Sequence, residues 1–188
     1  MAETKDDVFR AAEEKMGKAV SVNKEELSSI RSGRASPTLL NRITVDYYGT
    51  QVPLNTIANM SVPEPRLLVI SPYDKNSISA IEKALQASDL GITPNNDGNV
   101  IRLAFPQLTE ERRKEMIKLA HIRAEEGRVS IRAVRRHAKQ ELEKMKKDGS
   151  LSEDEERAAE TQLQKLTDRF VHEVDENLKR KEAELSEV

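Results

Sequence analysis

The sequence predicts an α+β protein, with an elongated three-helix bundle and a small hinged β/α/β domain inserted after the first helix. Three long segments carry apolar residues at steps of three and four, the spacing of one helix face. Between the first and second of them the period changes to two, the spacing of a half-buried strand. Charged residues make up 34% of the 188 residues and aromatic residues only 3%, which is typical of helical bundles.

The first helix is predicted over residues 3–31. Gly33 is a typical stop signal, and Pro37 excludes further helix. One face of the segment repeats every seven residues and needs partner helices to cover it. The residues on this face are Phe9, Met16, Asn23 and Ile30.

A small α/β domain is predicted over residues 32–106. Residues 43–47 alternate as a half-buried strand, 67–70 form an apolar run suited to a central strand, and a helix follows from about residue 77 to Gly91. Asn95-Asn96-Asp97-Gly98 is a strong turn signal before a last strand at 100–104. Two linkers then connect this domain to the bundle and are expected to act as a hinge. The hinge residues are Ser32, Gly33, Arg34, Ala35, Phe105 and Pro106.

Two further helices complete the bundle, which comprises residues 1–31 and 107–188. Ser152-Glu-Asp-Glu155 matches a capping box after the break at Gly149, so a short loop joins two antiparallel helices. The second helix, over 109–147, has a buried seam of small and apolar residues. This seam consists of Ile117, Ala120, Ala124, Gly127, Ile131, Val134, Ala138, Leu142 and Met145.

A basic stripe lies one residue further along the same helix, at a rotation of about 100° from the buried seam. Glu125 is its single acid. At about 1.5 Å per residue the stripe extends for about 37 Å, and a rigid basic face of that length suits a polyphosphate backbone. Its members are Lys114, Lys118, His121, Glu125, Arg128, Arg132, Arg135 and Lys139.

The net charge of −2 conceals a segregation of charge along the chain. Residues 109–149 hold thirteen basic and eight acidic residues, a net +5, whereas 150–188 hold six and twelve, a net −6. Four arginines fall within 128–136, and their planar forks can grip phosphate at two points. A charged helix face is also often only a solubilising face, and the acids of the third helix could pair with the stripe. Both alternatives stay open on sequence alone.

Several kinds of chemistry are not expected. The chain has no cysteine, which excludes disulfides and a cysteine nucleophile. His121, His137 and His172 lack metal-ligand spacing, and the acidic pairs lie among many other charges, so we expect no metal site, no cofactor and no enzyme activity. No apolar run reaches about 18 residues and the N-terminus lacks a signal peptide. We therefore expect a cytoplasmic monomer without membrane contact.

Nucleic acid recognised by its shape is the partner that this pattern favours. Six aromatic residues provide no stacking platform for single strands. Phosphate and 2′-hydroxyl contacts to folded, largely helical RNA are within reach of a basic helix face. The affinity should then fall steeply with salt.

Four motifs, in this order, closely resemble those of the ribosome recycling factor family, and the resemblance covers essentially the whole chain. They are Arg31-Ser-Gly-Arg-Ala-Ser-Pro, Tyr47-Tyr-Gly-Thr-Gln-Val-Pro-Leu, Leu108-Thr-Glu-Glu-Arg-Arg-Lys and Arg128-Val-Ser-Ile-Arg-Ala-Val-Arg-Arg.

The resemblance implies a bundle and a hinged β/α/β domain similar in outline to an L-shaped tRNA. It implies binding to the post-termination ribosome and, with elongation factor G and GTP, separation of the subunits with release of messenger RNA and tRNA. Elongation factor G would press on the small domain and hinge, and the GTPase chemistry would be its own. The residues expected to contact large-subunit ribosomal RNA are Arg112, Arg113, Arg128, Arg132, Arg135, Arg136 and Lys139.

Three positions depart from the family pattern, and one competing hypothesis remains. Ala133 and His137 replace asparagine and aspartate, which makes the helix locally more positive. Gly127 replaces alanine, and because glycine in a helix interior costs about 1 kcal/mol we expect a softer helix there. The competing hypothesis is a coiled-coil adaptor or chaperone-like module whose arginines serve internal pairing. An enzyme would need a titratable cluster lining a pocket.

Overall fold

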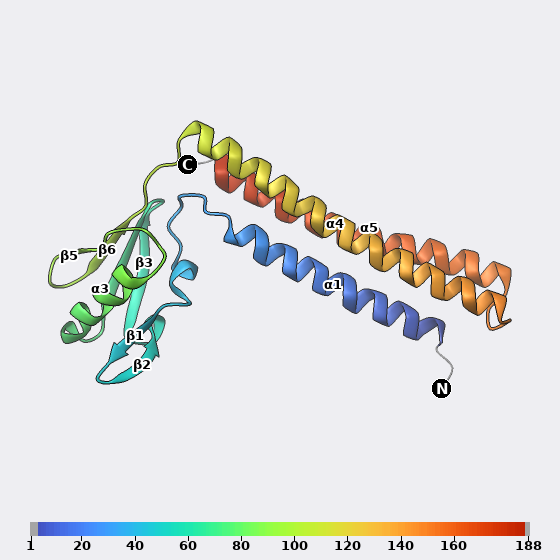
Figure 1. The fold of residues 1–188 in the computed structure, drawn as a ribbon, viewed down its shortest axis with the longest axis horizontal. Coiled ribbons are helices and arrows are strands. Elements are labelled where there is room, and N and C mark those ends of the chain that lie inside the picture. The colour runs from blue at the N-terminus through green and yellow to red at the C-terminus, as the bar shows by residue number, and fades with distance from the viewer. Residues whose placement is uncertain (1–3, 187–188) are drawn as a thin grey trace. The chain divides into compact units, whose positions relative to one another are not determined.

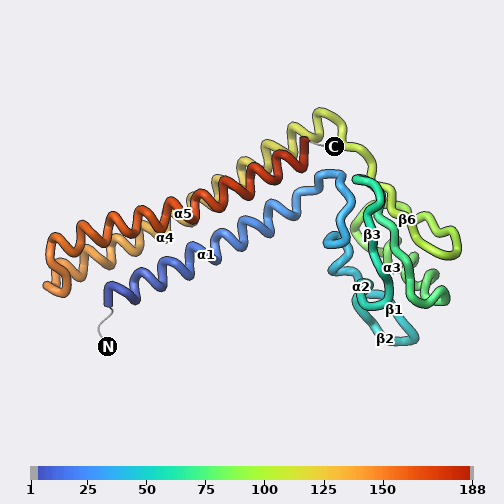
Figure 2. The backbone as a smooth tube through the Cα atoms, turned by 180° about the vertical axis from the view of Figure 1, so that it is seen from behind, coloured from blue at the N-terminus to red at the C-terminus, as the bar shows by residue number. Residues whose placement is uncertain are grey.

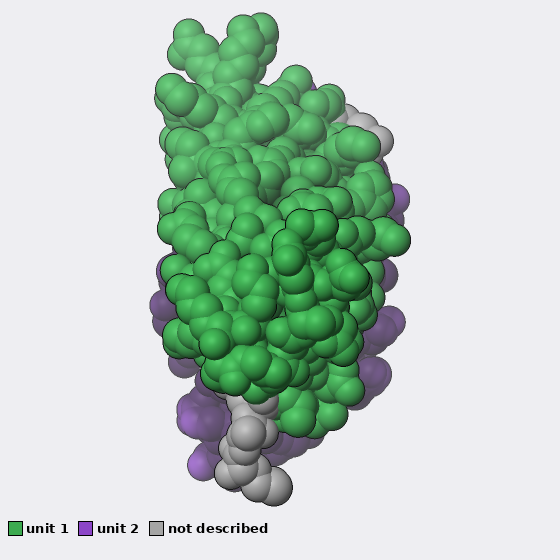
Figure 3. Space-filling model, turned by 90° about the vertical axis from the view of Figure 1, so that its right-hand side faces the viewer, with its two compact units in different colours: residues 1–31, 110–187 green, residues 32–109, 188 purple. Residues whose placement is uncertain are grey.

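The computed structural model describes residues 4–186, and the chain divides into two compact units. The first unit combines the segment up to Arg31 with the segment from Glu110 onward, and the second spans residues 32–109 (Figure 3). The first unit is therefore discontinuous in sequence, with the second inserted between its first and second helices.

The first unit consists of three long helices, α1 (Lys5–Ser29), α4 (Glu110–Lys147) and α5 (Glu153–Ser186). They lie side by side, and α4 runs antiparallel to both α1 and α5 (Figures 1 and 2). The predicted seam of α4 is largely confirmed, because six of its nine residues are buried and Ile117, Val134 and Met145 are half-buried. The predicted three-helix arrangement is therefore correct.

Capping determines where α1 and α5 begin. Thr4 accepts a hydrogen bond from the backbone N–H of Asp7, and the Asp7 carboxylate accepts one from the Thr4 N–H. The predicted capping box at α5 is present: the Ser152 hydroxyl accepts from the Glu155 N–H at 3.3 Å, and the Glu155 carboxylate accepts from the Ser152 N–H at 2.8 Å. These bonds satisfy N–H groups that have no partner within the helix. Residue 3, the predicted first residue of helix one, lies outside the described residues.

The turn between α4 and α5 is short and internally bonded. Gly149 adopts a φ of 83°, a left-handed conformation that glycine tolerates best. The N–H groups of Ser150 and Leu151 both donate to the carbonyl of Met145, and Leu151 is buried. The turn therefore fixes α5 against α4 from its first residues.

The second unit contains two antiparallel sheets. A two-stranded sheet pairs β1 (Thr44–Tyr47) with β2 (Thr50–Pro53). A four-stranded sheet has the order β3-β4-β6-β5. Its strands are β3 (Ala58–Glu64), β4 (Leu67–Pro72), β5 (Asn95–Asn96) and β6 (Ile101–Ala104).

The core of the second unit lies between this sheet and its helices. The predicted apolar run occupies β4, an inner strand, where Leu68 and Ile70 are fully buried. Helix α3 (Ile78–Ala87) contributes Ile81 and Leu85 to the same cluster. Sequence reasoning missed β5 and the one-turn helix α2 (Leu54–Ile57). The unit also contains two short 3₁₀ turns, Pro37–Leu40 and Lys75–Ser77.

Asp97 holds the turn between β5 and β6. Its Oδ1 accepts hydrogen bonds from the N–H groups of Asn99 and Val100, both at 2.9 Å, and the Arg102 guanidinium donates to Oδ2. The Val100 N–H, then the Arg102 guanidinium and the Asn99 N–H, hold the pKa of this carboxyl well below its ordinary value. The ionised form is therefore the one that stabilises the hairpin.

We expect Asp97→Asn to lower the melting temperature of the second unit at pH 7. Because the folded pKa is depressed, the stabilisation is fully present above the unfolded pKa of about 4 and is lost as the pH falls through the folded pKa. The difference in melting temperature between wild type and variant should then become smaller below about pH 4. All three tyrosines, Tyr47, Tyr48 and Tyr73, lie in this unit, so tyrosine absorbance follows its melting. A difference that stays constant down to strongly acid pH would contradict this role.

Candidate nucleic-acid interface

Between Arg128 and Lys139, five cations of α4 share one sector of the helix, which we call the basic face. At about 100° per residue, their side chains fall within a sector of about 100°. That sector lies between the buried seam and the outward side of α4, next to α5. The basic face consists of Arg128, Arg132, Arg135, Arg136 and Lys139.

Arg128 is the member held most firmly. Its side chain is 22% exposed and pairs with Asp175 of α5 at 2.7 Å and with Glu125 of its own helix at 3.0 Å. A guanidinium bound on two sides and partly desolvated is expensive to move, because breaking it away leaves a charge without its partner. Arg128 therefore joins α4 to α5 as well as contributing positive charge to the surface.

Arg132 and Arg136 are oriented toward solvent. Arg132 is 48% exposed and pairs with Glu125, seven residues earlier on the same helix. Arg136 is exposed and forms no ion pair with any residue from 4 to 186. The guanidiniums of Arg132 and then Arg128 hold the pKa of Glu125 below its ordinary value. Glu125 is thus ionised at neutral pH and aligns both arginines from one side.

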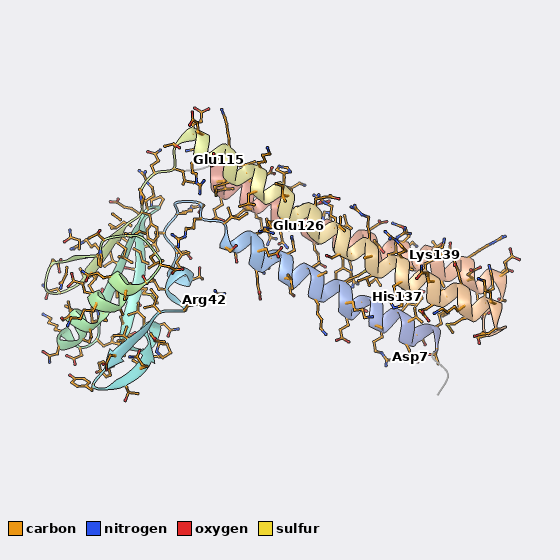
Figure 4. All side chains as sticks on the ribbon, viewed as in Figure 1. Asp7, Arg42, Glu115, Glu126, His137 and Lys139 are labelled. Atoms are coloured by element: carbon orange, nitrogen blue, oxygen red, sulfur yellow. The ribbon has the colours of Figure 1, made fainter. Side chains whose placement is uncertain are left out.

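Arg135 and Lys139 reach across toward α5. Arg135 donates from Nη1 to the Gln164 amide oxygen at 3.1 Å, and Lys139 pairs with Glu160 at 3.1 Å. Figure 4 marks Lys139 on α4 beside α5. The expectation that acids of the third helix could pair with the stripe is therefore met for His121, Arg128 and Lys139. It is not met for the other three arginines: Arg132 pairs within α4, Arg135 bonds the neutral Gln164, and Arg136 has no ion pair among residues 4–186.

The structure separates the other two sequence-predicted ligands from the basic face. Arg112 lies about 160° around the helix axis from Arg132 and pairs with Glu115 of its own turn. Arg113 is half-buried and lies about 100° from Arg132. The two arginines therefore do not extend the basic face.

The described residues hold neither a metal-binding cluster nor a membrane-spanning helix. Among residues 4–186, nowhere do three or more histidine, cysteine or acidic side chains converge as a metal would require. His121 instead pairs with Glu182 of α5, and His137 lies 3.8 Å from Glu141. No helix in this part of the chain combines the length and apolarity needed to cross a bilayer.

Comparison with known proteins gives one consistent result. The family model described as "Ribosome recycling factor" matches residues 23–185. The ribosome-recycling factor of Acidothermus cellulolyticus is 56% identical over 183 residues, which cover 97% of this chain and 99% of that protein. The one of Thermobifida fusca is 54% identical over the same shares. This chain belongs to the ribosome recycling factor family.

Solved structures agree with the sequence match. A solution structure of the ribosome recycling factor superposes with a TM-score of 0.82 at 42% identity, covering all of both chains. A second structure superposes with a TM-score of 0.68 at 43% identity, covering 97% of this chain and 98% of that one. It consists of models for the T. thermophilus ribosome recycling factor and the E. coli elongation factor G bound to the E. coli post-termination complex. Ribosome recycling factors are translation factors, so the basic face belongs to a protein that acts in translation.

In this member of the family, the predicted hinge residues are anchored in the second unit. The Ala35 N–H donates to the Pro65 carbonyl and the Phe105 N–H to the Arg66 carbonyl, both at 2.8 Å. Both linkers therefore attach to the same β3–β4 turn. Gly33 has a φ of 75°, and a Cβ at that position would lie 3.2 Å from the Pro106 carbonyl oxygen. The linkers pass close to each other at Gly33, and both this close approach and the positive φ disfavour a larger residue.

The remaining hinge positions lie in the same segment. Ser32 is buried, and its hydroxyl accepts a hydrogen bond from the Arg34 N–H at 3.3 Å. The unit boundaries fall just outside these residues, after Arg31 and before Glu110.

Sequence reasoning missed how α1 and α4 meet. Asn23 is 1% exposed and donates from its side-chain nitrogen to the Arg123 carbonyl at 2.7 Å. A Cβ on Gly127 would lie 2.9 Å from the Asn23 side chain. The expectation that Gly127 merely softens the helix was therefore incomplete, because its missing side chain makes room for a buried amide. The available signal in the sequence was Asn23 itself, a polar residue on the otherwise apolar stripe of the first helix.

Proposed function

We propose that this protein binds the post-termination ribosome by placing the basic face of α4 against phosphates of large-subunit ribosomal RNA. With elongation factor G and GTP, it then promotes separation of the subunits and release of messenger RNA and tRNA. The observation that carries the proposal is the clustering of five cations in one sector of a helix whose chain belongs to the ribosome recycling factor family.

The basic face has the properties that phosphate binding requires. Four of its five members are arginines, and each guanidinium offers five donors in a planar fork. Arg132, Arg135 and Arg136 have donors that are not tied to an acid of another helix. Since α4 is continuous from Glu110 to Lys147, the donors are held at fixed spacing. Little backbone entropy is then lost when they meet a rigid RNA.

RNA would be recognised by its backbone and shape. The basic face contains no aromatic side chain, so it offers no surface on which bases could stack. The strongly exposed tyrosines, Tyr48 and Tyr73, both belong to the second unit. Phosphates and 2′-hydroxyls of a folded RNA are the groups that arginine and lysine can reach without reading sequence.

The second unit and its linkers are proposed to respond to elongation factor G. Because Ala35 and Phe105 are bonded to the β3–β4 turn, the proposed pivot lies closer to the unit boundaries, in residues 31–34 and 106–109. The GTPase chemistry belongs to the partner, and we assign no catalytic residue to this chain. We propose that it acts as a monomer in the cytoplasm.

We expect Arg135→Ala to weaken binding to isolated large ribosomal subunits by at least about 1 kcal/mol, or roughly fivefold, because a charged hydrogen bond to phosphate is lost. Thermal stability should change little, since the acceptor Gln164 is uncharged and the bond is exposed. Binding is measured at several salt concentrations, and subunit splitting is measured with and without elongation factor G and GTP. Unchanged affinity, or affinity insensitive to salt, would contradict the proposal.

A second candidate is a helical adaptor that binds a protein partner and uses its arginines for internal pairing. The pairs Arg128–Asp175 and Lys139–Glu160 between α4 and α5 favour it. On this hypothesis Arg135→Ala would lower the melting temperature of the bundle and leave any RNA binding unaltered. The two measurements above therefore distinguish the candidates.

A further inference from the structure

A groove of about 390 Å³ lies between α4 and α5 beside the basic face. Three cations line it, and one of them, Arg157, comes from α5 and not from α4. Glu160 is the one acid in the lining, and the other polar groups are the hydroxyl of Thr161 and the amide of Gln164. A concave site with three cations and one acid favours an anion.

We propose that this groove seats one phosphate of the ribosomal RNA, held between Arg135 and Lys139 of α4 and Arg157 of α5. The proposal rests on the proposed function, because it takes the RNA that lies on the basic face to be the source of the phosphate. It adds a ligand from a second helix. The RNA contact would then span the α4–α5 junction and not follow α4 alone.

The present partners of Arg157 and Lys139 can be exchanged for a phosphate. Arg157 pairs with Glu153 one turn earlier on α5 at 2.6 Å, and the two side chains are 72% and 68% exposed. Lys139 is shared between Glu160 at 3.1 Å and Glu143 at 3.9 Å. Exposed ion pairs of this kind contribute little to stability. Releasing them for a phosphate that accepts hydrogen bonds from both side chains therefore costs little.

Arg135 is oriented by a chain of neutral and charged bonds. The Gln164 side-chain nitrogen donates to the Asp168 carboxylate at 2.7 Å, which directs the Gln164 amide oxygen toward Arg135. One guanidinium N–H is used in that bond. Because a guanidinium carries five N–H donors, others remain for a phosphate in the groove.

Acidic residues limit the site on the side of the α4–α5 turn. A neighbouring groove of about 350 Å³ is lined by four glutamates and only three cations, Lys146, Lys147 and Arg157. Its glutamates are Glu143, Glu153, Glu156 and Glu160. Repulsion between these carboxylates and a phosphate backbone places the end of the RNA contact at Arg157.

The experiment compares binding of full-length variants to isolated large ribosomal subunits over a range of salt concentrations. We expect Arg157→Ala to bind about 5- to 20-fold more weakly at low salt, with the slope of log affinity against log salt reduced by about one, as for one lost phosphate contact. Arg157→Lys should restore most of the slope, since lysine retains the charge, but only part of the affinity, because it lacks the fork.

Arg180→Ala is the matched control, since it removes one positive charge from an exposed position on the same helix. At about 100° per residue, Arg180 lies about 140° from Asp175 and about 160° from Glu182, two of the α5 residues that pair with α4. It should bind as wild type does. Helical circular dichroism at each salt concentration verifies that all variants are folded.

Two results would overturn the phosphate seat. One is a wild-type affinity and slope for Arg157→Ala. The other is an equal loss for Arg157→Ala and Arg180→Ala, which would indicate long-range charge alone. Arg132→Ala, whose side chain does not line the groove, separates this proposal from the proposed function. If Arg132→Ala weakens binding and Arg157→Ala does not, only the seat is wrong; if neither does, the proposed function also fails.

Discussion

Replacing Gly127 with alanine should destabilise the three-helix unit by about 2 kcal/mol, although alanine is the better helix former. The added Cβ would lie 2.9 Å from two atoms of the buried Asn23 side chain. Overpacking typically costs about 1–3 kcal/mol, and displacing the amide from the Arg123 carbonyl leaves a buried polar group without its bond at about 1–3 kcal/mol. The gain in helix propensity is only about 1 kcal/mol.

The sign of this effect should reverse when Asn23 is also changed. With Asn23→Ala as background, the space opposite residue 127 is empty and no buried amide needs a partner. Gly127→Ala should then stabilise the unit by about 1 kcal/mol, through helix propensity alone. The coupling between the two positions would be about 3 kcal/mol, at the upper end of values for residues in direct contact.

The measurement is urea unfolding of the four proteins of the cycle, followed by two signals. Helical circular dichroism reports mainly on α1, α4 and α5, which hold 25, 38 and 34 residues against 10 in α3. Tyrosine fluorescence reports on the second unit, where all three tyrosines lie, and should be unaffected. If Gly127→Ala changes the free energy of unfolding in the same direction in both backgrounds, the contact between Asn23 and residue 127 does not determine its effect.

The long helices could be predicted from the sequence because each repeats its buried seam many times. A seam that recurs over 25 residues or more gives a period that no alternative structure shares. The missed elements lack this redundancy. Helix α2 has four residues and β5 has two, too few for any period to be visible. They form because the neighbouring chain supplies their partners, as β6 does for β5.

The candidate site was predictable in part for a similar reason. Which side of α4 each arginine occupies follows from about 100° per residue, and so does the clustering of Arg132 and Arg136. The contacts between α4 and α5 do not follow from the sequence, because the pairing of Arg128 with Asp175 depends on how α5 is rotated and translated against α4. Asn23 was visible on the stripe of α1, but its contact with Gly127 requires the relative alignment of two helices about 100 residues apart.

Reversing the charge of Arg132 and Arg136 together should reduce binding to large ribosomal subunits by at least about 100-fold. Each loses a charged hydrogen bond to phosphate of about 1.5–3 kcal/mol, and about 3 kcal/mol corresponds to roughly a hundredfold. The two glutamates add repulsion toward the RNA. Subunit splitting with elongation factor G and GTP should fall in parallel at limiting protein concentration and recover in part when the concentration is raised.

The fold should tolerate this double substitution, because neither arginine pairs with another helix among residues 4–186. Arg132 pairs only within α4, and both side chains are exposed. A matched control reverses Arg10 of α1, whose side chain is 80% exposed, and Arg180 of α5, which changes the net charge equally. If the control loses as much affinity as Arg132→Glu/Arg136→Glu, total charge and not the basic face governs binding. If only Arg132→Glu/Arg136→Glu loses affinity and its helical melting is unchanged, the contact with the RNA lies on α4.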